Sequence, residues 1–210
     1  DATWADSYIR IKISMIKEVS AHSVTHTKYG QVARVTTLGL TYGGTLANNK
    51  FISLVDETLG STANFPCDTG SVAAAAVSGS PNSAQSGPKQ AGATDKTAVI
   101  DTTVMSTAKT YAVCYTNGDG TTSASWRDAG IRLVLSKVTL LEREAPTRTM
   151  YSYNIMQATN RLPQSLYQAM TYGGDIGINK WLSFVDASLN SNNPCIDGHI
   201  AAAVDDSTHS

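Results

Sequence analysis

Apolar and polar side chains alternate along residues 6–17, which read DSYIRIKISMIK. One face of this pattern carries the apolar residues Ile9, Ile11, Ile13 and Met15, and the other carries Tyr8, Arg10, Lys12 and Ser14. A period of two residues is typical of a β-strand with one buried face. The pattern returns after Gly130, with the inward residues Ile131, Leu133 and Leu135. We therefore expect a half-buried strand in each of the two regions.

Several other stretches also predict strands. Residues 18–40 are rich in valine and threonine and predict one or two strands. Their counterpart, residues 139–170, is longer, and Pro146 and Pro163 interrupt it. Residues 50–59 fit either a strand or a short helix, as do their repeat-related residues KWLSFVDASL. We favour strands there because the neighbouring segments are strand-like.

Small-residue runs follow two of the cysteines and are interpreted as strands, VAAAAV over residues 72–77 and IAAAV over residues 200–204. Residues 98–107 and 109–116 resume the apolar-polar alternation. NGDG at residues 117–120 is a strong signal for a hairpin turn. The first strand of the second repeat follows this turn directly.

One stretch of the sequence occurs twice, which indicates a tandem array. Each copy begins with TYGG and ends with Pro-Cys, at Cys67 in the first and Cys195 in the second. A second pair of matching segments, ATWADSYIRIKIS and ASWRDAGIRLVLS, aligns Trp4 with Trp126 and gives a repeat of about 120 residues. The residues that define the repeat are Trp4, Trp126, Tyr42, Gly43, Gly44, Tyr172, Gly173, Gly174, Asp56 and Asp186.

A unit of this size can bury a core of its own, so we expect two domains, residues 1–124 and 125–210. The second lacks a counterpart of residues 109–116, which indicates a piece of a longer polypeptide. The continuing chain or a neighbouring chain would then complete its open sheet edge.

Residues 78–97 contain no large apolar side chain, and we expect a mobile loop or a carrier of O-linked glycans. Short strands between turns predict an all-β fold of tandem Ig-like β-sandwiches, the second truncated.

The three cysteines fit this repeat. Cys67 and Cys114 belong to the first copy, and we expect a disulfide between them. Cys195 occupies the position of Cys67 in the second copy, so its partner would be a cysteine outside this chain segment. A bridge that closes about 47 residues stabilises a fold by roughly 4 kcal/mol in the chain-entropy model and indicates an oxidising, extracellular compartment. Buried free thiols in a cytosolic protein are the alternative.

Charge and composition restrict the partners of the chain. Sixteen basic and 17 acidic residues are scattered without a basic stripe, which argues against nucleic acid. The sequence has no apolar run of membrane-spanning length. It also has no Asn-x-Ser/Thr acceptor site, so any attached glycans would be O-linked. We expect the partners to be copies of the chain, neighbouring repeats of the same polypeptide, or glycans.

Few side chains suggest chemistry. His22 and His26 are four residues apart and could bind a metal, but the second copy has no matching pair, so we expect no metal site there; His199 and His209 are interpreted as surface histidines. Asp56 and Asp186 match between copies; they could serve a glycosidase or, with Asp119, bind calcium. A carboxylate that accepts backbone N–H bonds in a turn explains them better. We expect no enzyme activity and no cofactor, since nucleophile and dinucleotide motifs are lacking in the sequence.

The tryptophans have two interpretations. Trp4, Trp126 and Trp181 could form a sugar-stacking platform, but we favour core positions for all three. Trp181 in particular aligns with Phe51, which suggests that this position takes an apolar ring.

The segment TYAVCYTNGDGTTSASWRDAGIRLVLS resembles a tandem module of large secreted surface proteins of algae and other protists. The resemblance covers most of both copies. It implies an extracellular structural or adhesive role, for example in surface filaments such as flagellar hairs. Our first hypothesis is therefore a non-catalytic structural protein that assembles into a filament or coat. The alternative is a carbohydrate-binding or adhesion module.

Overall fold

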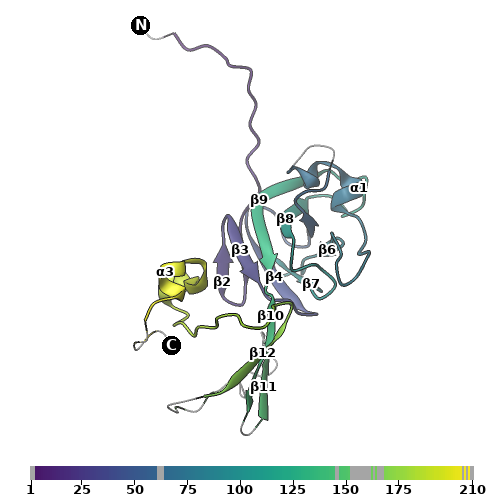
Figure 1. Cartoon of the computed structure of the whole chain (residues 1–210). Helices are drawn as coiled ribbons and strands as arrows, with labels where there is room; N and C mark the ends of the chain where they lie inside the picture. The colour runs from purple at the N-terminus through teal and green to yellow at the C-terminus, as the bar shows by residue number, and fades with distance from the viewer. Residues whose placement is uncertain are drawn as a thin grey trace.

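A computed structural model of the 210-residue chain describes residues 3–60, 64–144, 147–151, 162, 164, 168–204, 206 and 208. Strands dominate this described part, and its helical segments are single turns (Figure 1). The predicted all-β class is therefore confirmed. The Ig-like topology and the domain boundary at residue 124 remain predictions.

The first sheet has four antiparallel strands. Its order is β2 (Val24–His26), β1 (Ile16–Ala21), β4 (Leu38–Gly44) and β7 (Thr97–Ile100). The β1–β4 ladder ends where Gly44 lies with a φ of 124°, which an L side chain rarely adopts. A Cβ atom there would lie 2.3 Å from the carbonyl oxygen of Met15. This position of TYGG therefore requires glycine.

The second sheet has five strands. Its order is β3 (Tyr29–Val32), β9 (Trp126–Leu135), β8 (Thr110–Thr116), β5 (Phe51–Asp56) and β6 (Lys89–Gln90). All neighbours are antiparallel except β3 and β9, which are parallel. The predicted strand within residues 50–59 is confirmed as β5. The predicted hairpin is also present, because β8 and β9 pair across the NGDG loop.

The main core lies between these two sheets. The four-stranded sheet contributes buried side chains such as Val19, Leu40 and Ile100, and the five-stranded sheet contributes Leu54 and Leu133. Three buried tyrosines also lie in this core, and each hydroxyl group has a partner. Tyr42 donates to the Ala47 carbonyl oxygen at 2.6 Å, Tyr115 accepts from the Met15 N–H at 2.8 Å, and Tyr111 donates to Ser83 and Ser106 carbonyl oxygens. Burial of these tyrosines therefore leaves no hydroxyl group without a hydrogen bond.

A smaller apolar cluster covers the outer face of the five-stranded sheet. There η1 (Pro66–Asp68) and α1 (Gly70–Ala73) pack with Val55, Cys114 and Trp126. β5 and β8 are consequently buried on both faces. The prediction of a strand over VAAAAV is wrong, because residues 70–73 form a helical turn. Consecutive alanines favour a helix over a strand. This stretch packs on the sheet beside the Cys67–Cys114 disulfide without pairing to any of its strands.

Residues 78–97 pack against β5, although they lack large apolar side chains. Ser83 and Ser86 are buried, and Ser86 Oγ accepts the Leu54 N–H at 2.9 Å and donates to the Gly87 carbonyl oxygen. Ser83 Oγ donates to the Gln85 carbonyl oxygen at 2.6 Å. The expectation that this segment buries too little surface to be ordered is therefore wrong for residues 83–91, which are hydrogen-bonded to β5 and to one another. Small hydroxyl residues can be buried when their hydrogen bonds are satisfied.

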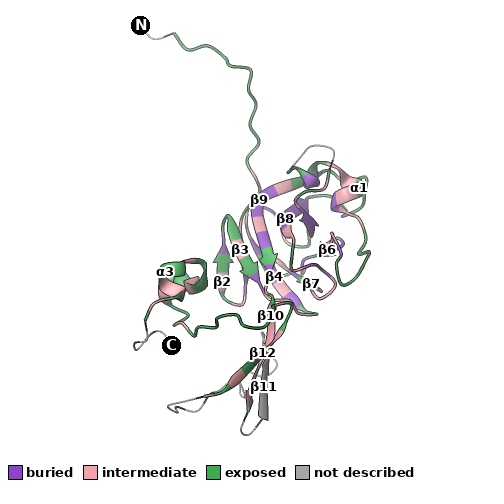
Figure 2. Ribbon diagram, viewed as in Figure 1, coloured by how far each residue is buried: buried purple, intermediate pink, exposed green. Residues whose placement is uncertain are grey.

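The N-terminal segment, residues 3–13, runs away from both sheets (Figure 1). It pairs with no strand among the described residues, and Ile9, Ile11 and Ile13 are 71%, 84% and 90% exposed (Figure 2). The predicted half-buried strand is therefore wrong for this part of the chain, and only residues from Ile16 onward join a sheet. Trp4, predicted to be a core residue, is also exposed. The apolar face is present, but no sheet of the described residues covers it.

The described part of the second copy contains a three-stranded antiparallel sheet of β11 (Thr147–Tyr151), β10 (Val138–Glu144) and β12 (Met170–Gly174). It is followed by the short turns α2 (Leu189–Asn192), η2 (Pro194–Ile196) and α3 (Gly198–Ala201). The predicted strands within residues 180–189 and 200–204 are wrong: the first stretch has only an isolated bridge residue, and the second contains α3. Pro146 and Pro163 lie outside the described residues.

The aromatic residues of the second copy are uncovered. Trp181 is fully exposed and Phe184 is partly exposed, so the predicted core position of Trp181 is wrong in this structure. In the first copy, the matching Phe51 packs against the cluster that includes Cys114 on β8. Among the described residues, no strands lie beside Trp181 in the places that β8 and β9 take in the first sandwich.

Candidate assembly site at the junction of the repeats

The strand β9 connects the two copies. The repeat alignment assigns residues 126–135 to the start of the second copy, yet β9 lies between β3 and β8 of the first. It runs parallel to β3, where the Arg132 N–H donates to the Lys28 carbonyl oxygen at 2.8 Å and the Ser136 N–H donates to the Val32 carbonyl oxygen at 2.9 Å. It runs antiparallel to β8, with Leu133 opposite Tyr111. A strand from one copy thus fills an interior position in the sheet of the other.

Side chains on both faces of β9 fix it in this position. Ala129, Ile131, Leu133 and Leu135 enter the main core, and this alternation is visible in Figure 2. Trp126 enters the outer cluster, where it is 5% exposed and its Nε1–H donates to the Thr121 carbonyl oxygen at 3.0 Å. The predicted core position of Trp126 is therefore confirmed. Core contacts along one face and Trp126 on the other hold β9 inside the sheet, while Arg127 and Val134 of the same strand stay exposed.

A bulge and an ion pair shape the middle of β9. The register against β8 shifts between Asp128 and Arg132, and Gly130 has a φ of 77°. Arg132 donates to both carboxylate oxygens of Asp128, at 2.9 and 2.7 Å, and its Nε lies 3.2 Å from Glu57. The hydrogen bond to Asp128 raises the pKa of Arg132 above its usual value. A paired, largely buried guanidinium of this kind fixes the geometry of the strand.

The chain passes from the first copy to the second without a flexible linker. β9 ends at Leu135 and β10 begins at Val138, and Ser136 Oγ donates to the Val138 carbonyl oxygen at 2.8 Å. Asp175, directly after β12, accepts hydrogen bonds from Arg34 at 3.1 Å and from Thr107 at 3.2 Å. Side chains of the first copy therefore contact the second copy beside the covalent connection.

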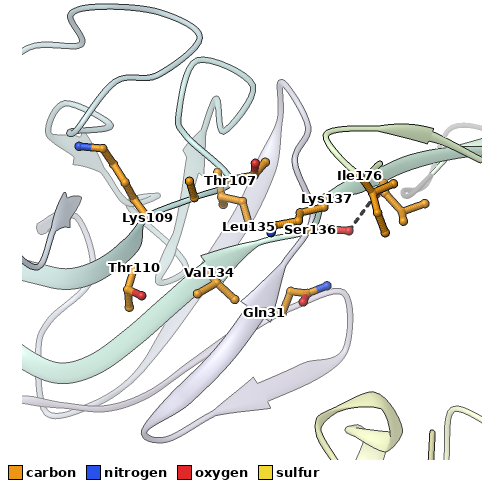
Figure 3. Close-up of a pocket in the computed structure, with 11 residues that line it drawn as sticks. Gln31, Thr107, Lys109, Thr110, Val134, Leu135, Ser136, Lys137 and Ile176 are labelled. Carbon is orange, nitrogen blue, oxygen red and sulfur yellow. Dashed lines mark hydrogen bonds between the residues drawn. The ribbon is translucent and has the colours of Figure 1, made fainter. Parts of the chain in front are cut away.

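A pocket of about 460 Å³ lies beside this junction (Figure 3). Its lining comes from both copies and includes Gln31 on β3, Val134 on β9, Lys137 between β9 and β10, and Ile176 after β12. Lys109 also lines it, but the amine of Lys109 is paired with Asp56. The lining offers no convergent set of acids, bases or nucleophiles. The pocket is therefore best described as part of the contact between the two copies.

The disulfide between Cys67 and Cys114 is present, as predicted, with a Cα–Cα distance of 5.3 Å. It connects η1 to β8 within the outer cluster, and Cys114 pairs with Asp128 of β9 in the sheet. Cys195 is exposed and is not in a disulfide. Its position in η2 matches that of Cys67 in η1. The partner predicted for Cys195 outside this segment remains a prediction.

The candidate calcium residues lie in three separate turns. Asp56 is buried, accepts the Thr58 N–H and hydroxyl hydrogen bonds, and pairs with Lys109. Burial alone would raise the pKa of Asp56, but the hydrogen bonds from Lys109 and Thr58 outweigh it and hold the pKa below its usual value. Asp186 accepts the equivalent bonds from Ser188, and Asp119 accepts them from Thr121. All three carboxylates thus act as turn acceptors.

Within the described ranges, no group of three or more His, Cys, Asp or Glu side chains could hold a metal ion. His22 and His26 lie in the β1–β2 hairpin, and burial lowers the pKa of each. The ring of His26 lies against Gly30, where a Cβ atom would come within 2.2 Å of its Nδ1. The described helices include none that is long and apolar enough to cross a membrane.

The TYGG motifs have the same local structure in both copies. Tyr172 donates to the Gly177 carbonyl oxygen at 3.0 Å, as Tyr42 does to Ala47. Gly44 and Gly174 end equivalent bulged ladders with φ values of 124° and 133°, and Gly43 and Gly173 occupy equivalent paired positions. The motif therefore has the same structural role within each copy.

The predicted boundary at residue 124 assigns residues 126–135 to the second domain. The hairpin turn predicted at NGDG nevertheless requires residues 110–116 and 126–135 to pair, so the sequence contains a signal for the position of β9. Two strands paired in this way belong to the same sheet.

No family model, no curated protein and no solved structure matches the chain.

Proposed function

We propose that this chain is a segment of a non-catalytic, extracellular structural protein, in which each sandwich is closed by the first strand of the next repeat. One observation carries the proposal: β9, which begins the second copy by sequence, lies between β3 and β8 of the first. Consecutive repeats would then be connected through the interior of a sheet. Such an array transmits tension through a hydrogen-bonded strand and not through a loop.

The contacts around the junction support a stiff array. Two residues separate β9 from β10, and Asp175 is held by Arg34 and Thr107. A connection this short leaves little freedom between neighbouring units, whereas flexible linkers of many residues let domains reorient. A string of such units suits a filament or a surface coat, where identical contacts recur along one axis.

The extracellular setting rests on the disulfide. Cys67 and Cys114 are both buried, and their bridge joins the helical layer to the middle of the sheet. Stable structural disulfides are typical of oxidising compartments. The sparse and balanced charge, 16 basic against 17 acidic residues, also suits a protein that contacts its own copies more than nucleic acid.

We also propose that the sandwich is Ig-like. The order β1-β4-β7 corresponds to strands A, B and E, and β5-β8-β9 corresponds to C, F and G, with β6 added at the edge. Tyr111, near the start of β8, bonds to the Ser106 backbone through its hydroxyl group, as the tyrosine corner of Ig-like domains does. The disulfide differs, because Cys67 lies in η1 and not in strand B.

Carbohydrate binding is the second candidate, and the fully exposed Trp181 favours it, because a free indole face can stack on a sugar ring. A glycan array decides between the candidates: saccharide binding that Trp181→Ala abolishes supports adhesion. The structural proposal is tested by immunogold electron microscopy of intact source cells, with antibodies raised against the purified chain. Label along surface filaments or a regular coat is expected, and label confined to the cell interior would contradict the proposal.

A further inference from the structure

The N-terminal segment has the sequence of β9. Residues 3–13 and 125–135 align without gaps, and Trp4, Asp6, Ile9 and Arg10 are identical to Trp126, Asp128, Ile131 and Arg132. Of the four residues of β9 that enter the main core, Ile131, Leu133 and Leu135 match Ile9, Ile11 and Ile13, and the small Ala129 matches the small Ser7. The outward position of Val134 takes the charged Lys12. The segment therefore fits the pattern of burial that β9 shows.

The segment also has the local backbone geometry of β9, although no described strand pairs with it. Tyr8 has a φ of 57°, where its counterpart Gly130 has 77°. The Tyr8 N–H donates to Asp6 Oδ1 at 2.7 Å, and the Gly130 N–H donates to Asp128 Oδ1 at the same distance. A positive φ is rare for a tyrosine, so the bulge is a specific feature and not a default of extended chain.

The ion pair of the β9 bulge is repeated as well. Arg10 donates to both oxygens of Asp6, at 2.9 and 2.8 Å, as Arg132 does to Asp128. In β9 this pair lies on the outer side of a strand whose inner face is buried in the main core. In the N-terminal segment the same pair is exposed, and three isoleucine side chains beside it are 71–90% exposed. The segment is thus shaped for a sheet that the described part of this chain does not offer it.

We propose that residues 3–13 are the closing strand of another sandwich of this same kind, inserted between its β3-like and β8-like strands. The place in this chain's own sheet is taken by β9, and residue 16 already begins β1 in the opposite sheet, so the recipient is a different module. From the β9 register, Ile11 lies opposite the counterpart of Tyr111 and Arg10 lies opposite the counterpart of Ala112. The inference deepens the proposed function, on which it rests, by naming the partner of this segment.

A strand graft tests the fit in the full chain. Residues 125–135 are replaced by the sequence of residues 3–13, and a control graft carries aspartate in place of Ile9 and Ile11. The expected result is one cooperative transition with a melting temperature within about 8 °C of the parent, and an intact disulfide. The control graft is expected to lose that transition, because two carboxylates would enter the core. A graft that melts no better than its aspartate control overturns the inference.

A peptide experiment tests binding between molecules. The full chain with Ile131→Asp and Leu133→Asp has a disabled β9, and synthetic peptides of residues 1–14 and 124–136 are added to it. Both are expected to raise its melting temperature in a saturable way, and a residue 1–14 peptide with aspartate at positions 9 and 11 is not. Rescue by the 124–136 peptide but not by the 1–14 peptide overturns the inference alone. If the doubly substituted chain melts like the parent, β9 does not close the sandwich, and the proposed function fails with the inference.

Discussion

Truncating one isoleucine in β9 and its counterpart in the N-terminal segment should have very different effects. Ile131 is 1% exposed in the main core, whereas Ile9, at the equivalent repeat position, is 71% exposed. The two variants, Ile131→Ala and Ile9→Ala, remove the same atoms from the same kind of sequence. Any difference in unfolding free energy therefore reports which of the two strands is packed in a sheet.

The expected magnitudes follow from burial. Ile131→Ala removes three buried carbons, worth about 2.4 kcal/mol in transfer free energy, and leaves a cavity that brings the loss to about 3–4 kcal/mol. Ile9→Ala lies on an exposed segment and should change the unfolding free energy by less than about 0.5 kcal/mol. The difference between the variants is thus about 3 kcal/mol, a large fraction of the stability of a domain of this size.

Urea denaturation followed by far-ultraviolet circular dichroism measures this difference, with the disulfide kept oxidised. The protein concentration is kept low, so that the N-terminal segment does not bind a second molecule. The midpoint of the Ile131→Ala variant should fall well below that of the parent, and the Ile9→Ala midpoint should not move. Equal shifts for the two variants, or a larger shift for Ile9→Ala, would refute the placement of β9 in the first sandwich.

Three further substitutions test other parts of the structure. Replacing Cys67 and Cys114 together by alanine should lower the unfolding free energy by about 4 kcal/mol for a 47-residue separation, and an unchanged urea midpoint would contradict a stabilising bridge. Gly44→Ala should lower the unfolding free energy by at least about 2 kcal/mol, because the φ of Gly44 is 124° and a Cβ atom there would meet the Met15 backbone. Gly43→Ala is the milder control, because its Cβ atom would meet only the Glu18 side chain. Equal losses of stability in the two variants would refute this reasoning. Because hydrogen bonds hold the pKa of Asp56 below its unfolded value of about 3.9, its contribution is fully present above that pH and is lost as the pH falls through the folded pKa. Asp56→Asn should therefore flatten the acid limb of the stability profile and cost about 2 kcal/mol at pH 7, and an unchanged acid limb would count against the Lys109 pair.

Much of the first sandwich could be predicted from residue patterns. Strand β5, the hairpin around NGDG and the Cys67–Cys114 bridge all follow from short-range signals or from the repeat. Each of these features depends on neighbours in sequence or on pairing by position within the repeat. Local rules are sufficient for such features.

The failures have a common physical cause. Alternation identifies which face of a strand is apolar, but it does not identify the sheet that covers that face. Residues 9–13 and 131–135 have nearly the same pattern, yet Ile9, Ile11 and Ile13 are exposed while their counterparts Ile131, Leu133 and Leu135 are buried. Trp181 and Phe51 differ in the same way, because β8 and the disulfide lie beside Phe51 and no such partners lie beside Trp181 among the described residues. Whether an apolar face is buried depends on strands and helices that are distant in the sequence, and the local pattern does not identify them.

Hydrogen exchange of the backbone amides tests the central claim most directly. Mass spectrometry of peptides that cover residues 3–13, 110–116 and 126–135 compares the three segments in one experiment. If β9 closes the first sandwich, residues 126–135 should exchange as slowly as residues 110–116, and residues 3–13 should exchange at the rate of an unprotected chain. Fast exchange of residues 126–135, together with slow exchange of residues 110–116, would contradict the claim.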